Sequence, residues 1–594
     1  MDKNSIKVIL ATDCGSTTTK AILIEYINNE YRLTCRGEAP TTVESPFEDV
    51  TRGVLNAIIE IEELSGRTIL DGEKIINKGS NNTGVDIYIS TSSAGGGLQM
   101  MVGGVVKSMT AESAERAALG AGAIVMDVLS LNDKRKYHEK VQVIRELRPD
   151  MLLLSGGIDG GSKSHVVELS EIIAAAKPKP RLGMDYKLPI IYAGNKEASP
   201  DISKRLNKIS DLTIVDNIRP KLEIENLQPS RDKIHDLFME HVMAQAPGYK
   251  KLMSWTNHPI MPTPGAVGEI IKKISKSEKM NVVGVDIGGA TTDVFSVFDK
   301  KFNRTVSANL GMSYSICNVL SESGLNNIKR WLPFEIDDKI LTNRIANKMI
   351  RPTTIPQTLD DLKVEQAIAR EALSLSFKQH KNFAVSLKGI QQERTISDTF
   401  EQSSTGESLV DMLSLDLIVG SGGVISHAPK RSQAARLLID SFLPEGITQL
   451  AVDSIFMMPQ LGILSEVHLE AALEVFNKDC LVRLGTCIAP TGEIKADILC
   501  DYKITNSNTN IEGKLNVNDL LLHELPYELF EIEINPTRGI DMGSGRGIPI
   551  KKEIYGGEVG IFIDGRKRPI TFDDENENIN QIKKWSSSTK EFEE

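Results

Sequence analysis

The sequence has few aromatic residues and no long apolar run. Phe, Trp and Tyr make up 5% of the 594 residues, and only three are Trp. This scarcity argues against a surface that stacks sugars or single-stranded nucleic acid. No stretch approaches the roughly 20 apolar residues of a membrane-spanning helix. The N-terminal MDKNSIKVILATD leads directly into an apolar strand without a signal peptide. We therefore expect a cytoplasmic protein that has no membrane partner.

Cysteine pairs and excess positive charge are also missing. The six cysteines include no C-x-x-C pair, so neither a zinc site nor an iron–sulfur cluster is indicated. Reduced, mostly buried thiols are the expectation. The formal net charge of −11 disfavours nucleic acid as a partner. The P-loop pattern G-x-x-x-x-G-K-[ST] does not occur, so any phosphate site must be built in another way.

A stretch rich in small hydroxyl residues, ATDCGSTTTK at 11–20, lies between two apolar runs. Glycine and hydroxyl residues are ordinary in tight turns, so a plain hairpin is one interpretation. The other is a phosphate-binding turn, in which backbone N–H groups converge on an anion. Lys20 would either reach the phosphate as a point charge or be a solvated lysine on the outgoing strand. The remaining candidate phosphate contacts are Gly15, Ser16, Thr17 and Thr18.

A second hairpin of this kind follows about half a chain later, in NVVGVDIGGATTDVFSVF at 281–298. Aligning Asp13 with Asp286 superposes Gly15 on Gly288 and leaves the threonine pairs one position apart. Such internal repetition predicts two related lobes that face a common cleft. A third segment, LDLIVGSGGVIS at 415–426, ends an apolar strand with glycines that let a ligand approach the backbone. Its candidate contacts are Gly420, Ser421, Gly422 and Gly423.

These three segments, in this order, resemble the actin-like ATPase superfamily, which includes sugar kinases and heat-shock chaperone ATPases. In that superfamily two hairpins open the two lobes, and a later Gly-Gly turn meets the adenosine. Residues 286–293 fit the chaperones' D-x-G-G-x-T-x-D signature. The resemblance implies an α/β fold with two ribonuclease H-like lobes and ATP or ADP as ligand. The nucleotide contacts that it implies in the second hairpin are Gly288, Gly289, Thr291, Thr292 and Asp293.

Phosphoryl transfer needs positioning and charge compensation more than covalent help. Asp13 and Asp286 would face Mg²⁺, one from each lobe, through its water shell. Both are candidate catalytic and metal residues, and Asp286 is the stronger candidate for orienting the attacking water. A nucleotide on the Gly-Gly turn would collide with any Cβ at Gly422. We therefore expect Gly422→Val to weaken ATP and ADP alike while leaving the nucleotide-free fold nearly intact.

The rest of the chain predicts further domains around these hairpins. Residues 1–275 form the first lobe, and apolar strands alternating with helices predict a parallel α/β unit inserted at about 127–250. Residues 276–490 form the second lobe, with a mostly helical insertion at about 310–410. Strong alternation at 491–575 predicts a small antiparallel, barrel-like β domain.

Three local expectations belong to this outline. Residues 110–128 have the pattern of a helix with small faces for close packing. SGGIDGG at 155–161 could bind an anion at the start of the following helix, with Asp159 as the polar contact, or be an ordinary glycine-rich strand end. The polar tail at 576–594 has the composition of a disordered segment.

The whole chain resembles the glutamate mutase L family, the MutL-type accessory ATPases of cobalamin-dependent aminomutases, which are unrelated to the mismatch-repair protein of similar name. The stretches that carry this resemblance span residues 10–569: DCGSTTTK, SSAGGGLQMMVGG with AERAALGAGA, LLLSGGIDGG, VDIGGATTDV, IVGSGGV and GGEVGIFIDGRKRP. Cys14 stands where this family is expected to have an aromatic residue. The resemblance implies an ATP-driven chaperone or reactivating factor that opens an adenosylcobalamin-dependent mutase, such as glutamate mutase, and lets damaged cobalamin leave. The partner would hold the cobalamin.

Two alternatives remain open at this point. A small-molecule kinase of the same superfamily would use the α/β region at 140–220 as its substrate lobe, although no sugar-type signature is evident. A filament-forming protein like actin is disfavoured by the β domain and the inserted α/β unit. The expected partners are mutase subunits and, as a further option, a second copy in a homodimer. The sequence names neither the client mutase nor its amino-acid substrate.

Overall fold

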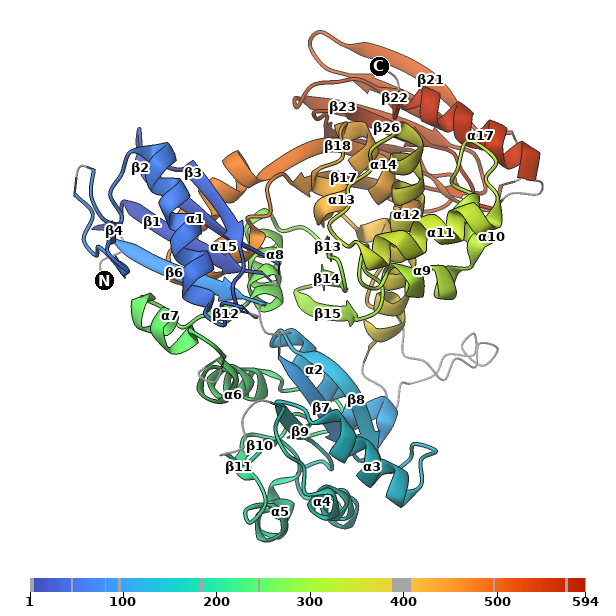
Figure 1. The fold of residues 1–594 in the computed structure, drawn as a ribbon. Coiled ribbons are helices and arrows are strands. Elements are labelled where there is room, and N and C mark those ends of the chain that lie inside the picture. The colour runs from blue at the N-terminus through green and yellow to red at the C-terminus, as the bar shows by residue number, and fades with distance from the viewer. Residues whose placement is uncertain are drawn as a thin grey trace. The chain divides into compact units, whose positions relative to one another are not determined.

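The computed structural model describes residues 5–15, 17–43, 46–80, 82–93, 98–181, 186–243, 246–386, 408–494, 497–571 and 575–592. Ser16, a predicted phosphate contact, lies outside the described residues. The chain forms two compact units (Figure 1). Unit 1 comprises Met1–Ile270, Ser386–Glu407 and Met458–Asp479, and unit 2 comprises Ile271–Val385, Ser408–Met457 and Cys480–Glu594. Among the described residues, no helix combines the length and apolar character needed to cross a bilayer.

Unit 1 contains a five-stranded mixed sheet in the order β12-β6-β1-β2-β3. Its strands are β1 (Val8–Cys14), β2 (Thr18–Ile27), β3 (Glu30–Pro40), β6 (Ile87–Ser92) and β12 (Met261–Pro262). The first three form an antiparallel meander, while β6 runs parallel to β1 and β12 parallel to β6. A short hairpin joins β4 (Leu70–Asp71) and β5 (Lys74–Ile75).

Helix α1 (Val50–Ser65) covers one face of this sheet. The buried residues Val54, Ala57, Ile58 and Ile61 recur at helical spacing and form its apolar stripe. The Asp49 side chain accepts the Thr51 N–H as an N-cap, which satisfies a donor that the helix leaves unpaired. The helix thus packs with its apolar stripe against the sheet that contains the first hairpin.

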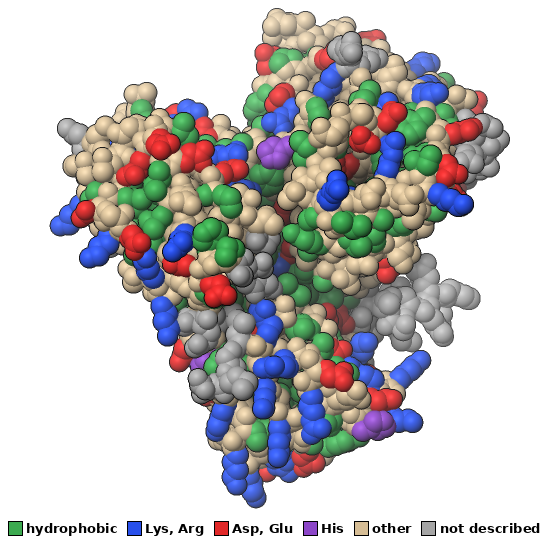
Figure 2. Space-filling model, viewed as in Figure 1, with side chains coloured by type: hydrophobic (Ala, Val, Ile, Leu, Met, Phe, Trp, Pro, Cys, Tyr) green, Lys and Arg blue, Asp and Glu red, His purple; other side chains and the backbone are tan. Residues whose placement is uncertain are grey.

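A second, wholly parallel sheet completes unit 1 in the order β11-β10-β9-β7-β8. Its strands are β7 (Gln99–Gly104), β8 (Ile124–Ser130), β9 (Met151–Leu154), β10 (Pro189–Tyr192) and β11 (Asp211–Ile214). Its helical segments are η2 (Lys107–Ala111), α2 (Glu112–Gly120), α3 (Tyr137–Leu147), α4 (Ser164–Ala176), η3 (Lys196–Ala198), α5 (Ser199–Leu206), α6 (Gln228–Leu237), η4 (Phe238–Val242) and α7 (Tyr249–Trp255). Figure 2 shows Lys and Arg side chains to be frequent on the visible surface of this part.

The parallel α/β unit is present as predicted, but it starts earlier than residue 127. The predicted helix at 110–128 ends at Gly120, and Ile124–Ser130 is a strand that pairs with β7. Gly122 lies between the two elements with φ of 93°, a conformation that glycine adopts without steric cost. The insertion therefore begins with β7, near residue 98.

Helices α15 (Met458–Val467) and α16 (Leu469–Val475) belong to unit 1, which corrects the predicted placement of 276–490 in the second lobe. A Cβ at Gly462 would lie 1.9 Å from the carbonyl oxygen of Ala266 in helix α8 (Thr263–Glu278). Only glycine permits so close a helix contact. The segment continues as η8 (Phe476–Cys480), where Asp479 accepts two N–H groups of Arg32 from β3.

Unit 2 is built on an eight-stranded sheet in the order β15-β14-β13-β16-β17-β18-β26-β22. Its strands are β13 (Val282–Ile287), β14 (Thr292–Phe298), β15 (Lys301–Ser307), β16 (Leu417–Ser421), β17 (Gly446–Asp453), β18 (Leu481–Ala489), β22 (Leu520–His523) and β26 (Gly560–Asp564). The first five repeat the order and directions of β3, β2, β1, β6 and β12 in unit 1. The repetition predicted from the two hairpins therefore extends to all five strands of the unit 1 sheet and to five of the eight strands of the unit 2 sheet.

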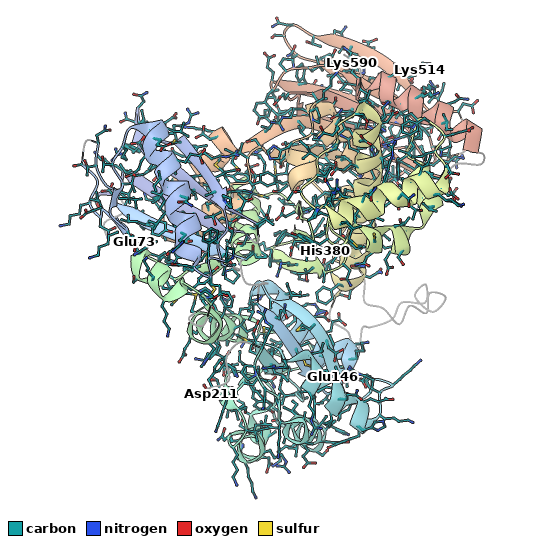
Figure 3. The ribbon with its side chains drawn as sticks, viewed as in Figure 1. Glu73, Glu146, Asp211, His380, Lys514 and Lys590 are labelled. Atoms are coloured by element: carbon teal, nitrogen blue, oxygen red, sulfur yellow. The ribbon has the colours of Figure 1, made fainter. Side chains whose placement is uncertain are left out.

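Helices cover this sheet as predicted for the insertion at 310–410, of which residues 387–407 are outside the described part. They are α9 (Ile316–Ser323), α10 (Leu325–Lys329), α11 (Asp338–Ile350) and α12 (Leu359–Phe383), followed later by η7 (Met412–Ser414), α13 (Gly423–Ser426) and α14 (Arg431–Phe442). His380 of α12 (labelled in Figure 3) is hydrogen-bonded through Nδ1 to Thr305 and through Nε2 to Ser296. Burial lowers the pKa of His380 to about 3, so this neutral histidine fixes the helix to the sheet.

Within 491–575 a four-stranded sheet is antiparallel, as predicted, but the strands do not form a separate barrel. Strands β22 and β26 join the large sheet instead, and β26 runs parallel to β18. A four-stranded sheet contains β20 (Ile498–Thr505), β21 (Asn510–Asn516), β23 (Leu529–Pro536) and β25 (Ile550–Tyr555), and a short pair joins β19 (Thr491–Gly492) and β24 (Ile540–Asp541). Ile504 and Ile532 of the small sheet share one apolar cluster with Ile488 and Ile563 of the large one. The two sheets therefore have a common core.

The described part of the tail, residues 576–592, is ordered, which contradicts the disorder predicted there. Residues Glu575–Ser588 form helix α17, and Ile582 and Trp585 are buried. The Trp585 indole donates to the carbonyl oxygen of Asn518 at 2.8 Å. Composition alone suggested disorder, because the few anchoring side chains are diluted by polar residues.

Candidate functional site

The two glycine-rich hairpins share the same turn hydrogen bond. Gly15 N donates to Thr18 O at 3.1 Å, and Gly288 N donates to Thr291 O at 2.9 Å. The turns are therefore equivalent without a gap, and Thr18 corresponds to Thr291. Thr17 then corresponds to Ala290, which confirms the one-position offset between the threonine pairs that the sequence alignment gives.

The carboxylate of Asp13 is held by two hydroxyl groups in unit 1. Its Oδ1 accepts from Thr91 Oγ1 at 2.7 Å and from Thr263 Oγ1 at 2.6 Å, and the residue is 7% exposed. Neither threonine was singled out from the sequence. The signal for Thr91 was the hydroxyl-rich end of its strand, Ser90–Thr91–Ser92, which lies beside the end of β1. These contacts orient Asp13 before any ligand arrives.

The other residues of the first hairpin are arranged around Asp13. Lys20 lies opposite Asp13 in the antiparallel register, so both side chains are on one face of the sheet. Thr17 is exposed and Thr18 half-buried. Thr41, which the sequence did not indicate, donates through Oγ1 to Gly15 O and through its N–H to Thr17 O. The residue that follows β3 therefore holds the turn through hydrogen bonds on one side, and the turn is exposed to solvent on the side of Thr17.

Cys14 occupies the buried position under the first turn. Burial, followed by the neighbouring charge of Asp13, raises the pKa of the Cys14 thiol to about 12. The group stays protonated at neutral pH, which agrees with the inert, buried thiol expected from the sequence and excludes a reactive thiolate at this site.

In unit 2, Asp286 is half-buried at the end of β13, in register with Asp293 and Ser421. The Asp293 carboxylate accepts from Arg304 Nε at 2.9 Å and Nη2 at 2.6 Å. The Thr292 hydroxyl donates to the carbonyl oxygen of Leu310. Both predicted nucleotide contacts are thus committed to the interior of unit 2, which favours a structural role for their side chains.

The backbone of the second hairpin is clamped by the loop at 310–315, which the sequence did not indicate. Met312 N donates to Gly288 O and Ser313 N to Gly289 O, both at 2.9 Å. A Cβ at Gly311 would lie 2.5 Å from the Gly289 backbone. The Thr291 side chain is half-buried and Gly288 is exposed at the tip. The tip therefore stays accessible on a rigid base.

The Gly-Gly turn follows β16, and its four candidate residues have different surroundings. Gly422 has φ of 110°, and a Cβ there would lie 2.2 Å from the carbonyl oxygen of Ile287. A Cβ at Gly420 would press on Leu438, and Ser421 is buried. An added Cβ at Gly423 meets nothing within 4 Å, and this residue is exposed.

The expectation that Gly422→Val spares the nucleotide-free fold is therefore wrong. The new side chain would collide with the backbone at the end of β13 and require a strained φ. Gly423 is the position at which an added Cβ would meet no protein atom within 4 Å.

The loop SGGIDGG at 155–161 forms hydrogen bonds mainly with neighbouring segments of the protein. The Asp159 carboxylate accepts from Asn217 Nδ2 and Lys196 N, and Gly160 N donates to Glu197. The loop follows β9 beside β7, where the order of the parallel strands reverses and ligands commonly bind. A second ligand here remains a prediction, with Asp159 already engaged by the protein.

Within the described residues, no group of three or more His, Cys, Asp or Glu side chains is placed to hold a metal ion. Asp13 belongs to unit 1 and Asp286 to unit 2, and each unit is described by itself. Their joint Mg²⁺ site therefore stays a prediction.

Comparison with known proteins identifies the family. A family model described as MutL protein matches residues 9–480. Protein MutL of Clostridium tetanomorphum is 29% identical over 498 residues, which cover 79% of this chain and 98% of that protein. Residues 481–594 lie outside the range of the family match.

Solved structures give weaker likenesses. The nucleotide-free structure of acetone carboxylase is 11% identical with a TM-score of 0.31, covering 86% of this chain and 81% of that one. Xylulose kinase from Bifidobacterium adolescentis is 12% identical with a TM-score of 0.28, covering 80% and 94%. Scores of this size do not establish a common fold. The family match, by contrast, spans well over half of the residues, and the chain therefore belongs to the MutL family, the glutamate mutase L family that its sequence resembles.

Proposed function

We propose that the protein hydrolyses ATP in order to reactivate an adenosylcobalamin-dependent aminomutase, such as glutamate mutase or a related enzyme. The observation that carries the ATPase part is the repeated sheet with its repeated hairpin. Each copy places an aspartate at the end of the first strand and the same Gly N–H to Thr O turn behind it. This pattern supports two ribonuclease H-like, actin-like lobes, each of which offers one phosphate-binding turn.

The residues present suit a magnesium nucleotide. Mg²⁺ prefers oxygen ligands and keeps several waters, and Asp13 offers a carboxylate whose Oδ1 is already held by two threonine hydroxyls. Oδ2 of Asp13 and the Asp286 carboxylate would accept from those waters. When bound, the ion would compensate the charge of the phosphates. The one soft side chain of the first hairpin, Cys14, is buried with its pKa raised to about 12, so the thiol stays protonated and does not compete as a ligand.

The chain's own groups would position the reaction. Backbone N–H groups at the tip that follows Gly288 would donate to phosphate oxygens, while the Gly288 N–H itself keeps the turn closed on Thr291 O. Lys20 would add a point charge beside Asp13. Asp286 would accept a hydrogen bond from the attacking water and orient it. Gly423 would lie against the ribose or base, because its Cα faces open space. Gly15, Thr17, Thr18, Gly289 and Thr291 would make secondary contacts around the same phosphates.

The mutase part rests on membership of the MutL family. A cobalamin enzyme that loses its adenosyl group is inactive, and an exchange factor would release the damaged cofactor. ATP would favour one of two conformations, and a difference in affinity of these conformations for the mutase would supply the work. Cobalamin itself would stay with the mutase until release.

A release assay tests this function. A glutamate mutase inactivated with hydroxocobalamin is mixed with the protein and ATP–Mg²⁺, and free cobalamin is measured by absorbance after rapid filtration. We expect release with ATP and none with ADP or a non-hydrolysable analogue. Release that is equal without nucleotide would contradict the proposal. Appearance of a phosphorylated metabolite in the absence of a mutase would favour the kinase alternative.

Valine at Gly423 is expected to weaken ADP and ATP binding at least about tenfold, a loss of the size that one steric clash in a binding site produces. The thermal unfolding midpoint should stay within about 2 °C of the wild type, because Gly423 is exposed and an added Cβ has no atom within 4 Å. Isothermal calorimetry with ADP is the measurement.

Gly422→Val serves as the matched control. It should lower the unfolding midpoint, since its Cβ would strike the Ile287 backbone. Wild-type ADP affinity in a folded Gly423→Val protein would place the adenosine elsewhere.

A further inference from the structure

An open groove lies in unit 2 between helices α11 and α12, both of which pack against α9 (Figure 1). The segment 351–357, which connects α11 to α12, also lines it. Its volume is about 590 Å³, inside the roughly 300–1,000 Å³ range of small-molecule sites in proteins. We call this space the α11–α12 groove.

The lining of the groove is largely apolar. Ile316, Ile345 and Ile368, one from each of the three helices, line it and belong to the main apolar cluster of unit 2. Ile350 and Ile355 also line it and are 71% and 68% exposed. Covering two such side chains with a ligand removes apolar surface from water, which favours binding. The lining therefore suits a ligand with an apolar body.

Two ion pairs connect α11 to α12 beside the groove. Arg344 Nη1 lies 3.1 Å from Asp361 Oδ1, and Lys348 Nζ lies 3.1 Å from Glu365 Oε1. All four side chains line the groove, and these two carboxylates are the acidic groups of its lining. Each carboxylate is thus matched by a cation, so the lining offers no uncompensated negative charge to a cationic ligand.

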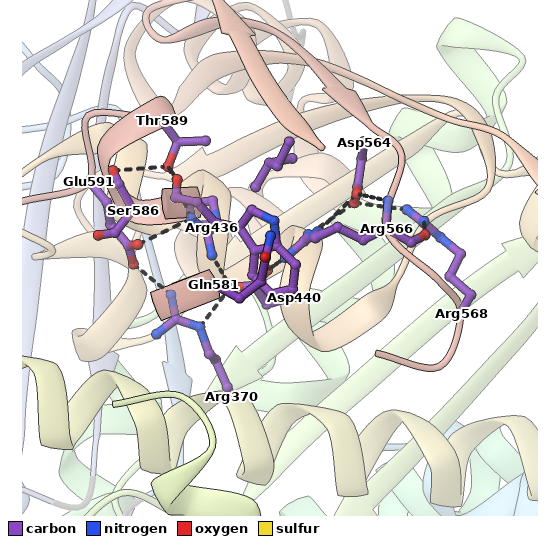
Figure 4. Close-up of polar contacts among 12 residues, drawn as sticks. Arg370, Arg436, Asp440, Asp564, Arg566, Arg568, Gln581, Ser586, Thr589 and Glu591 are labelled. Atoms are coloured by element: carbon purple, nitrogen blue, oxygen red, sulfur yellow. Dashed lines mark hydrogen bonds and ion pairs between the residues drawn. The ribbon is translucent and has the colours of Figure 1, made fainter. Parts of the chain in front are cut away.

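Arg351 is the third cation of the lining, and its surroundings differ. Its side chain is exposed and makes no hydrogen bond or ion pair within the described part of the chain. By contrast, Arg370, Arg436 and Arg566 elsewhere in unit 2 are all paired with carboxylates (Figure 4). A guanidinium group pairs bidentately with a carboxylate. The one uncompensated charge of the lining therefore favours an anion.

The segment that carries Arg351 is held in place by the protein itself. Lys348 Nζ donates to the carbonyl oxygen of Thr354, and Thr354 N donates to Arg351 O at 3.0 Å. Pro352 and Pro356 have fixed φ angles, which stiffen the connection. A preformed site loses less conformational entropy when a ligand binds, so the groove is ready to accept one.

We propose that the α11–α12 groove binds a small organic acid, with its apolar body between the two helices and its carboxylate on Arg351. Apolar contact supplies the affinity, and the arginine supplies the preference for an anion over a cation of the same shape. The groove shares no residue with the proposed phosphate-binding turns. This proposal therefore does not depend on the ATPase assignment.

Decanoate and decylammonium test the groove in the full-length protein without nucleotide or mutase. The two probes share an alkyl chain and differ in the charge of the head group. We expect decanoate to bind saturably, at least about 10-fold more tightly than decylammonium. Isothermal calorimetry below the micellar concentrations is the measurement. Absence of saturable decanoate binding, or equal affinity for the two probes, would overturn the proposal.

Substitutions assign the two parts of the ligand. Arg351→Gln should weaken decanoate binding at least about 10-fold without weakening decylammonium binding, because only the contact to the anion is lost. Arg546→Gln removes the same charge from an exposed arginine outside the groove and should bind decanoate like the wild type. Ile355→Ser should weaken both probes by a similar factor, since it removes apolar wall but no charge. Wild-type decanoate affinity in folded Arg351→Gln would contradict the proposal.

Hydrogen exchange locates the probe without any substitution. Decanoate should slow exchange of the amides between 347 and 357 at least about threefold and leave those of α14 unchanged. Slowing only outside this segment would place the probe elsewhere and refute the groove as the site.

Two further results would reassign the groove and overturn the proposal. Displacement of decanoate by ADP would make the groove part of the nucleotide site. A wild-type dimer that Ile350→Ser dissociates, seen by sedimentation, would show that a second copy covers it. None of these measurements uses ATP turnover or cobalamin release, so either proposal can fail without the other.

Discussion

Asparagine in place of Asp286 is expected to lower ATP turnover about 10²–10³-fold, the usual loss when one preorganised polar group is removed from an active site. The residue stands half-buried at the end of β13, and asparagine keeps its shape while removing the charge that would orient water and metal. The thermal unfolding midpoint should remain near that of the wild type. Phosphate release under saturating ATP–Mg²⁺ is the measurement, with circular dichroism to confirm the fold.

The aspartate directly across the hairpin provides the control. Asp293 is buried and paired with Arg304, so Asp293→Asn should cost about 3–5 kcal/mol of unfolding free energy, as expected when half of a buried ion pair is removed. Its turnover per folded molecule should fall much less than that of Asp286→Asn. Wild-type turnover in folded Asp286→Asn would remove Asp286 from the proposed mechanism.

The largest loss of stability is expected from Asp440→Asn. Asp440 is fully buried and pairs with Arg370, Arg436 and Arg566. Losing its charge leaves these guanidinium groups with too few carboxylates, and we expect at least about 3–5 kcal/mol less unfolding free energy. Guanidinium unfolding followed by tryptophan fluorescence will report it, because two of the three Trp, at 331 and 585, lie against these arginines.

Asp501→Asn is the matched surface change. Asp501 lies 3.8 Å from Lys514, and both side chains are exposed, so its loss should cost less than about 1 kcal/mol. Equal losses of unfolding free energy in the two variants would show that the buried network contributes no more to stability than an exposed ion pair does.

The buried network also predicts how stability depends on pH. Burial alone would raise the pKa of Asp564, but Arg566 and Arg568 lower it to about 2, and the three arginines hold the pKa of Asp440 well below its ordinary range. A depressed carboxylate pKa contributes stability above about pH 4 that is lost as the pH falls towards 2. The wild type should therefore lose stability steeply between pH 4 and 2, and Asp440→Asn less steeply.

The hairpins were predictable because their pattern is local. Asp, Gly and Thr at fixed spacing between two apolar runs specify a strand, a tight turn and a returning strand. Two short motifs were enough to indicate the repeat, which comprises five strands in each unit. The contacts that orient Asp13 were not predictable, because Thr91 and Thr263 are 78 and 250 positions away in the sequence and only the fold brings them to one carboxylate.

The errors share a physical cause: a residue's type and its local composition do not show which distant residues it contacts in the fold. Gly422 was judged by its sequence type as a ligand-facing glycine, but its neighbour is the end of β13, which only the sheet's register places there. The tail was judged by its average polarity, whereas its order depends on Trp585 and Glu591, two side chains that find specific partners. The start of the parallel sheet was missed because Gly120 and Gly122 look compatible with a helix of small residues.

Strand β18 begins one residue after the family match ends, and its outer edge is paired with β26 near the C-terminus. The pairing is so close that a Cβ at Gly485 would lie 1.7 Å from the carbonyl oxygen of Gly560. A chain cut near residue 490 would expose β18 as an apolar edge with free N–H and C=O groups, a template for aggregation. The residues up to Asp564 thus cover the outer edge of β18. The family-matched portion should therefore be expressed only together with them.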